Sequence, residues 1–452
     1  MAQDLKNISF IEGLKDFEKH FLAPSPDWLK TVRQDAFSRA LELGIPTVKN
    51  EEWKYTNVAP ITQHKYRLPK DKGKLTEKEQ FDLYCDPAEV NLVFLNGVFC
   101  PELSQTRAPA GIRVSTIAQA VKGQDKQIAE FFNRYSSKDE TAFTALNKAL
   151  AEDGAYLIIE DKAFIEPLVH IVHITSSGHQ AVMTSPRSLI AAGKSSQATV
   201  LESHLTFSDG ITYFTNALTD IFMSENAVLT YCKAQGESRK AYHIGTTRVR
   251  QERNSNFNGF SMVTGGAITR NNLDIALNDE GISSMLNGLY CVSGDQLVDN
   301  HTAVDHRFPN CVSNQLYKGI LNGSSRAVFN GKIFVKPIAQ KTNSYQLNKN
   351  LLLGKGCRVD TKPQLEIFAD DVKCTHGATI GQLNEDEVFY LQSRAISKKA
   401  ALKMLARGFV DDILAKIPNA SICRKLNVLL EPTFAAIDPH SPKRPAGHTG
   451  GG

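Results

Sequence analysis

The pattern of apolar and polar positions divides the 452-residue chain into three parts. In the first part, apolar residues recur at mixed and often helical spacing. One such helix is expected after Ser25-Pro26-Asp27, which suit an N-cap and a first helical turn, and it ends at Gly44. An apolar run turned by Asn-Gly over residues 91–99 predicts a β-hairpin. We therefore expect an N-terminal helical and mixed region over residues 1–154.

The central part, residues 155–383, has short β-branched runs separated by Gly, Asn, Asp and Ser. Examples are residues 198–201, 327–329 and 332–335, and no long amphipathic helix interrupts them. This pattern favours an all-β fold, namely a β-sandwich, a propeller or a parallel β-helix. The asparagine-rich runs resemble the stacked coils of a β-helix, but no strict period is visible, so the three architectures stay open.

After residue 383 the spacing becomes helical. Asn384 is an N-cap with acidic residues in the first turn, Ser397 begins a second helix, and a third stretch covers about residues 421–430. We expect a C-terminal helical domain over residues 384–438. The tail, residues 439–452, is rich in Pro, Gly and His and is predicted to be disordered.

Composition narrows the class of protein. The net charge is +4 with dispersed basic residues, which argues against a nucleic-acid groove. The basic run 243–253 alternates in charge and is predicted to be a solvated strand or loop. No stretch approaches the roughly 18 apolar residues of a membrane span, and the N-terminus does not resemble a secretory signal. We expect a cytoplasmic protein with no membrane or nucleic-acid partner.

The eight cysteines form no C-x-x-C pair, so familiar zinc and iron–sulfur spacings are absent and most thiols are expected to be reduced and buried. Cys374 and His376 are two residues apart and would share one face of a strand. Two ligands make an incomplete site, because zinc and most iron–sulfur clusters take four. Either buried packing or half of a shared site would explain this pair.

Other motifs carry weaker signals. Residues 191–195 end like a phosphate-binding loop, but Ser188 stands where the first glycine is required, so no nucleotide site is expected. His170 and His173 are three residues apart and would lie on opposite strand faces, which argues against one shared metal site. Residues 300–306 contain two histidines, yet no nucleophile elbow accompanies them, and packing within the β region is favoured.

Several motifs in order resemble one family. Residues 46–56 resemble the N-terminal signature of the SufD branch of the SufB/SufD family, which belongs to the SUF iron–sulfur cluster assembly system. Residues 299–319, 343–353, 373–379 and 386–394 are similar to the core that SufB and SufD share. The resemblance covers nearly the whole chain apart from the tail.

Two departures separate the chain from the SufB branch. SufB typically has His-Glu-Ala where this chain has His376-Gly377-Ala378, so a carboxylate is missing here. SufB is also expected to have additional N-terminal cysteines, which this chain lacks. The resemblance is therefore to SufD.

The resemblance implies a right-handed parallel β-helix over residues 155–383 between two helical regions. It also implies a non-catalytic scaffold subunit that forms a heterodimer with SufB and binds the SufC ATPase through residues 384–430, so that ATPase activity belongs to SufC. A transient iron ion or iron–sulfur cluster is implied at the SufB interface. His376 is the first candidate ligand there and Cys374 the second. Self-pairing of the isolated chain stays open.

A β-helix enzyme, such as a polysaccharide lyase or an acyltransferase, is the alternative. Such an enzyme needs an exposed groove with clustered acids, bases or arginines, or a regular hexapeptide period. The sequence shows neither clearly.

Overall fold

A computed structural model gives the fold of the chain. It describes residues 10–12, 17–69, 72–75, 78–135, 140–176 and 181–435. The tail that was predicted to be disordered, residues 439–452, lies outside the described residues.

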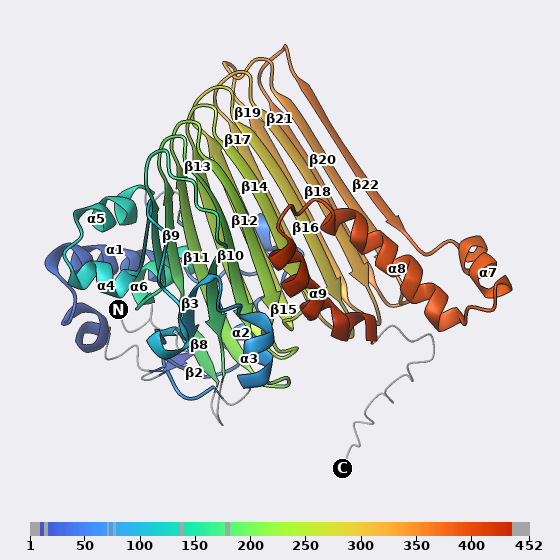
Figure 1. Cartoon of the computed structure of the whole chain (residues 1–452), viewed down its shortest axis with the longest axis horizontal. Coiled ribbons are helices and arrows are strands. Elements are labelled where there is room, and N and C mark those ends of the chain that lie inside the picture. The colour runs from blue at the N-terminus through green and yellow to red at the C-terminus, as the bar shows by residue number, and fades with distance from the viewer. Residues whose placement is uncertain are drawn as a thin grey trace.

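The described residues form a mainly β structure, a β-solenoid of about eight turns with helices at both ends of the sequence (Figure 1). The parallel β-helix expected from the resemblance is thus confirmed, and the β-sandwich and propeller are excluded. From β9 to β22, successive strands alternate between two sheets, and each of β9 to β20 pairs in parallel with the strand one coil later.

The first sheet contains, in order, β1 (Ile11–Glu12), β2 (Tyr66–Arg67), β8 (Val182–Thr184), β11 (Tyr213–Met223), β13 (Tyr242–Gln251), β15 (Ile268–Leu277), β17 (Leu297–His306), β19 (Arg326–Val335) and β21 (Arg358–Ile367). Strands β5 (Ile112–Thr116), β6 (Ala155–Ile159) and β9 (Arg187–Ala192) join it beside β11. The second sheet contains β4 (Val98–Phe99), β3 (Val90–Leu95), β7 (Val169–Ile174), β10 (Gln197–Leu205), β12 (Val228–Gly236), β14 (Asn256–Val263), β16 (Ser283–Val292), β18 (Val312–Leu321), β20 (Asn343–Leu352) and β22 (Lys373–Gly381).

Several of the asparagines and glycines between the strands adopt backbone conformations that most other residues disfavour. Asn226 and Asn254 lie at corners between the sheets with φ of 58° and 56°, and Gly294 and Gly323 lie at later corners with φ of 67° and 71°. This left-handed conformation is open to glycine and tolerated by asparagine. The corners therefore turn the chain from one sheet to the other.

The strands are longer than the sequence runs that predicted them. Residues 327–329 and 332–335 were two separate runs, but both belong to β19, with Asn330 and Gly331 inside the strand. Strand β19 pairs with β17 on one side and β21 on the other, so the ladder holds residues of low β-propensity in place. A Cβ at position 331 would lie 1.9 Å from Nε2 of Gln346, so a larger residue there would require the Gln346 amide to move.

The N-terminal region packs against the first coils (Figure 1). Its helices are α1 (Asp27–Leu43), α2 (Ala59–Thr62), α3 (Lys78–Tyr84), α4 (Ile117–Lys122), α5 (Lys126–Asn133) and α6 (Ala142–Leu150), with short helical turns at Glu18–Leu22, Glu51–Trp53 and Pro101–Leu103. Helix α6 lies between α1 and β11. The predicted hairpin is confirmed as β3 and β4, with Asn96 and Gly97 both at positive φ.

The prediction that residues 243–253 form a solvated strand or loop is right about the strand and wrong about its exposure to solvent. Residues 242–251 form β13, and the side chain of Arg248 is almost completely buried. Its guanidinium pairs with Asp220 and lies over the ring of Tyr135, 3.6 Å from the ring centroid. Tyr135 and other residues of the N-terminal region pack over this face of the first sheet. The alternating charges along residues 243–253 do not indicate whether another part of the chain packs over them.

The C-terminal part contains α7 (Glu385–Ser393), α8 (Lys398–Leu414) and α9 (Ala420–Ala435). The predicted helix starts are confirmed, since Oδ1 of Asn384 accepts from the N–H of Asp386 at 2.9 Å and Oγ of Ser397 accepts from the N–H of Ala400 at 3.2 Å. None of the helices in the described part combines the length and apolar content of a membrane-spanning segment.

Helices α8 and α9 lie on the outer face of the second sheet (Figure 1) and share one hydrophobic cluster with it. Val410 and Leu426 are among the buried helix residues, and Phe260 and Ile320 are among their sheet neighbours. The ammonium of Lys318 donates to the carbonyl of Phe409 at 3.0 Å, which ties β18 to α8. These two helices are therefore part of the folded core.

Candidate functional site

The solenoid ends at β21 and β22, which we call the open end. Among the described strands, β21 pairs with β19 alone and β22 pairs with β20 alone, so each leaves one backbone edge unpaired. Figure 1 shows β22 at the margin of its sheet, next to α7. Large apolar side chains are exposed at or near this end, including Phe368 and Ile380.

Cys374 and His376 both lie on β22, two positions apart. Cys374 is half-buried and packs against a small apolar cluster that contains Ile333 and Val335, and burial raises the pKa of its thiol. His376 is exposed and stands beside Gln346 of β20 in the ladder. Within the described residues, no set of three metal-ligating side chains includes either residue.

The histidines at 170 and 173 lie on opposite faces of β7, as the sequence predicted. The ring of His170 shares a 2.8 Å hydrogen bond with the Ser203 hydroxyl, while the ring of His173 stacks on that of His204 inside the solenoid. His301 pairs with Asp299 at 3.0 Å. The contacts of His170 and His301 are structural in kind, as was favoured for the 300–306 segment.

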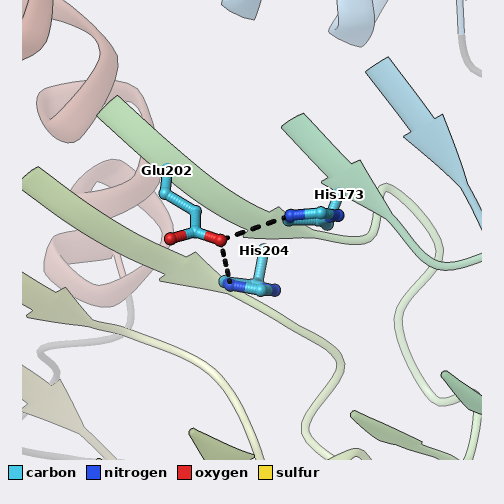
Figure 2. Close-up of side chains that lie close together, drawn as sticks. All are labelled: His173, Glu202 and His204. Carbon is cyan, nitrogen blue, oxygen red and sulfur yellow. Dashed lines mark ion pairs between the residues drawn. The ribbon is translucent and has the colours of Figure 1, made fainter. Parts of the chain in front are cut away.

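One group of ligand-bearing side chains could not be found from sequence spacing. His173 on β7 and Glu202 and His204 on β10 are buried together inside the solenoid, where Figure 2 shows both rings beside the same carboxylate oxygen. Oε1 of Glu202 is 3.3 Å from Nε2 of His173 and 3.9 Å from Nε2 of His204. The Glu-x-His spacing places Glu202 and His204 on one face of β10. His173 joins them only because the register of β7 and β10 sets it beside His204.

The carboxylate of Glu202 is held by hydroxyl groups. Oε1 accepts from Ser188 at 2.9 Å, and Oε2 accepts from Thr219 at 2.8 Å and from Tyr231 at 2.5 Å. Burial alone would raise the pKa of Glu202, but the neighbouring His173, His204 and Tyr231 outweigh it and keep that pKa below its ordinary value. Burial also lowers the pKa of His204 well below its ordinary value, so its imidazole is neutral.

Comparison with known protein families identifies the family to which this chain belongs. The family model described as SUF system FeS cluster assembly, SufBD core domain, matches residues 173–409, and the model described as SufBD protein N-terminal region matches residues 6–171. The chain belongs to the SufBD family. Both parts of the SufBD sequence are therefore present in one chain, as the motif order indicated.

Several SufBD relatives match over most of their length. A protein of Synechocystis named as an iron–sulfur cluster assembly SufBD family protein is 32% identical over 433 residues, which are 94% of this chain and 93% of that protein. The iron–sulfur cluster assembly protein SufD of Escherichia coli is 31% identical over 84% of this chain and 87% of its own. The SufD of Bacillus subtilis is 26% identical over 93% of this chain and 97% of its own. The predicted resemblance is confirmed.

Proposed function

We propose that this SufBD chain is the SufD-type scaffold subunit of an iron–sulfur cluster assembly complex. It pairs with a SufB-type subunit at the open end and binds the SufC ATPase through its C-terminal helices, and it has no catalytic activity of its own. The observation that carries the proposal is the pair of unpaired strand edges beside Cys374 and His376. All eight cysteines are free thiols, which supports a reducing compartment such as the cytoplasm.

The unpaired edges favour a partner of the same fold. Strands β21 and β22 have ten and nine residues, and edges of this length invite further strand pairing unless something covers them. A second solenoid could continue both sheets across the open end. Burial of Phe368 and Ile380 would then supply an apolar centre for the interface.

The candidate ligands would lie at that interface. His376 is exposed on β22, whereas the thiol of Cys374 is half-buried with its pKa raised by burial. Because the thiolate is the form that binds metal, this supports His376 as the first ligand and Cys374 as the second. The iron or cluster is the cargo of the complex, and the SufB-type subunit would complete its ligand set.

We place the functional units at the predicted boundaries, with a helical and mixed region over 1–154, the β-helix core over 155–383 and the SufC-binding domain over 384–438. Helix α7 presents the most suitable docking side chains, since Phe389 is 71% exposed and Tyr390 is 56% exposed. Met404 on α8 is also exposed. Exposed aromatic residues are frequent hot spots of protein interfaces.

Replacing Phe389 and Tyr390 together by alanine is expected to weaken SufC binding by about 100-fold or more, because a hot-spot aromatic contributes about 2 kcal/mol or more. Titration of purified SufC against the full chain by calorimetry measures this. Leu83→Ala is the matched control, since Leu83 is 73% exposed on α3 and should not affect binding. Unchanged affinity in the double variant would assign docking to another surface.

Replacing His376 by alanine is expected to reduce the yield of assembled cluster to about a tenth or less, as the loss of a supporting metal-site residue costs about 10–100-fold. The measurement is anaerobic reconstitution of the purified complex with SufB and SufC, followed by absorption and iron analysis. His20→Ala, at an exposed histidine of the N-terminal region, is the control. An equal yield in wild type and His376→Ala would remove His376 from the mechanism.

A further inference from the structure

We infer that His173, Glu202 and His204 form a binding site for one divalent transition-metal ion inside the solenoid. The group lies on β7 and β10, and strands β12, β14, β16, β18 and β20 separate it from β22 in the second sheet. It is therefore distinct from the candidate ligands at the open end. The inference does not rest on the proposed function.

The spacing of the ligand atoms fits a common ion. With bonds of about 2.0–2.2 Å to nitrogen and oxygen, neighbouring ligand atoms lie about 3.0–3.5 Å apart. Nε2 of His173 and Oε1 of Glu202 are already 3.3 Å apart. Nε2 of His204 is 3.9 Å from the same oxygen, and all three atoms lie within 4.8 Å of one another. To complete the triangle, the ring of His204 would have to move closer to Oε1 of Glu202 and to the ring of His173.

The two imidazoles have nitrogens without hydrogen bonds. The side chains of His173 and His204 are 7% and 2% exposed, yet within the described part of the chain both nitrogens of each ring lack a hydrogen-bond partner. Buried polar atoms are nearly always paired, so unpaired ones need an explanation. An ion bound by both Nε2 atoms supplies one. His173 is the least buried of the three ligands and marks the side nearer to solvent.

The carboxylate is oriented as a ligand. Ser188, Thr219 and Tyr231 donate hydrogen bonds that fix both oxygens of Glu202. Such supporting contacts are usual around metal-binding carboxylates and set the direction of the ligand.

The lysine that stands beside Glu202 in the ladder does not form a direct ion pair with it among the described residues. Lys233 stands opposite Glu202 in the register of β10 and β12. Its ammonium, however, donates to Oδ1 of Asn271 at 3.0 Å and contacts Nε2 of His243 at 3.3 Å, and the ion pairs among the described residues do not join it to Glu202. His243 in turn pairs with Glu237 at 2.8 Å. The ammonium of Lys233 is therefore hydrogen-bonded to groups other than Glu202.

The ligand set indicates the class of metal. Two imidazoles and one carboxylate are typical of Fe²⁺ and Zn²⁺ sites, whereas Mg²⁺ and Ca²⁺ prefer oxygen ligands alone. The competing explanation is plain stacking, because the rings of Phe94, His173 and His204 follow one another with centroids 5.0 Å and 4.9 Å apart. Stacking accounts for the position of the rings, but it leaves their nitrogens without hydrogen bonds and does not explain why both Nε2 atoms face Oε1 of Glu202.

The test uses the untagged full chain with Cys374→Ala and His376→Ala, so that ligands at the open end do not contribute. After removal of metal with a chelator, Co²⁺ is titrated anaerobically and followed by absorption, and Zn²⁺ affinity is measured by competition. We expect one ion per chain without a thiolate-to-cobalt charge-transfer band. His173→Gln in this background is expected to lower the Zn²⁺ affinity by at least about 10-fold. His170→Gln, on the same strand but the opposite face, should leave the affinity unchanged.

Several results would overturn the inference: no stoichiometric ion, a thiolate band, equal affinity in His173→Gln, or an equal loss in both variants. Circular dichroism shows whether each variant folds. If His173→Gln does not fold, X-ray absorption spectroscopy of the Zn²⁺-loaded chain that carries only Cys374→Ala and His376→Ala tests the site instead. A first shell of nitrogen and oxygen with imidazole scattering supports the site, and sulfur in that shell contradicts it.

Discussion

Replacing Ala378 by proline is expected to abolish pairing with the SufB-type subunit while the chain itself still folds. The N–H of Lys373 donates to the carbonyl of Thr342 at 2.9 Å, so this residue turns its backbone toward the rest of the sheet. Successive residues of a strand turn to opposite edges, and the N–H of Ala378 therefore points to the unpaired edge of β22. Proline removes that donor and is tolerated where a strand edge is free.

The affinity between the two subunits should fall by at least about 100-fold, because several main-chain hydrogen bonds of about 1 kcal/mol each depend on the edge. Co-purification and size-exclusion chromatography with the SufB-type subunit measure the loss. Ala378→Ser keeps the N–H and should pair normally. If Ala378→Pro pairs as tightly as wild type, the partner does not bind at β22. The same columns, run on the isolated chain, show whether it pairs with itself.

Replacing Asp220 by asparagine is expected to lower the free energy of unfolding by about 3–5 kcal/mol, since it removes one partner of a buried ion-pair group. Asp220 is fully buried between two arginines. Its Oδ2 accepts from Arg187 at 2.9 Å, and its two oxygens accept from Arg248 at 2.7 Å and 3.0 Å. Asparagine keeps the shape but removes the charged partner of the two buried guanidinium groups.

Urea denaturation of both proteins at neutral pH measures this difference. Asp411→Asn is the control, because the Arg407–Asp411 pair on α8 is partly exposed and should contribute no more than about 1 kcal/mol. Burial would raise the pKa of Asp220, but Arg248 and Arg187 outweigh it and hold that pKa below its ordinary value. The stabilisation is therefore present above the ordinary aspartate pKa of about 3.9 and is lost as the pH falls through the lowered one. A loss below about 1 kcal/mol for Asp220→Asn would contradict the prediction.

The sequence alone predicts those structural features that depend on contacts between neighbouring residues. Asn384 and Ser397 cap helices with their own side chains, and Asn96-Gly97 supplies both positive φ values of a tight hairpin. Each of these contacts spans a few residues, so the sequence pattern contains the whole cause. The start of α7, the start of α8 and the hairpin could therefore be predicted without the structure.

The solenoid itself was harder to predict from spacing. Its coils repeat after roughly 30 residues, a typical solenoid period, but the length varies from coil to coil and hides the repeat. The burial of Arg248 depends on Tyr135 and Asp220, which are far from it in sequence. The register that brings His173 to His204 likewise exists only after the coils have stacked. The local sequence pattern does not show which distant residues become neighbours in the stacked coils, nor which strand faces the N-terminal region buries.

A force applied to α8 would reach the solenoid directly. Val410 on this helix shares a hydrophobic cluster with Phe260 and Ile320 of the sheet, and Lys318 anchors the same helix from β18. There is consequently no soft joint between α8 and the second sheet, and the parallel ladder behind them is continuous from β7 to β22. We therefore expect α8, α9 and the coils that they contact to move together. A motor protein that bound α8 and α9 and displaced them would thus move the open end as well.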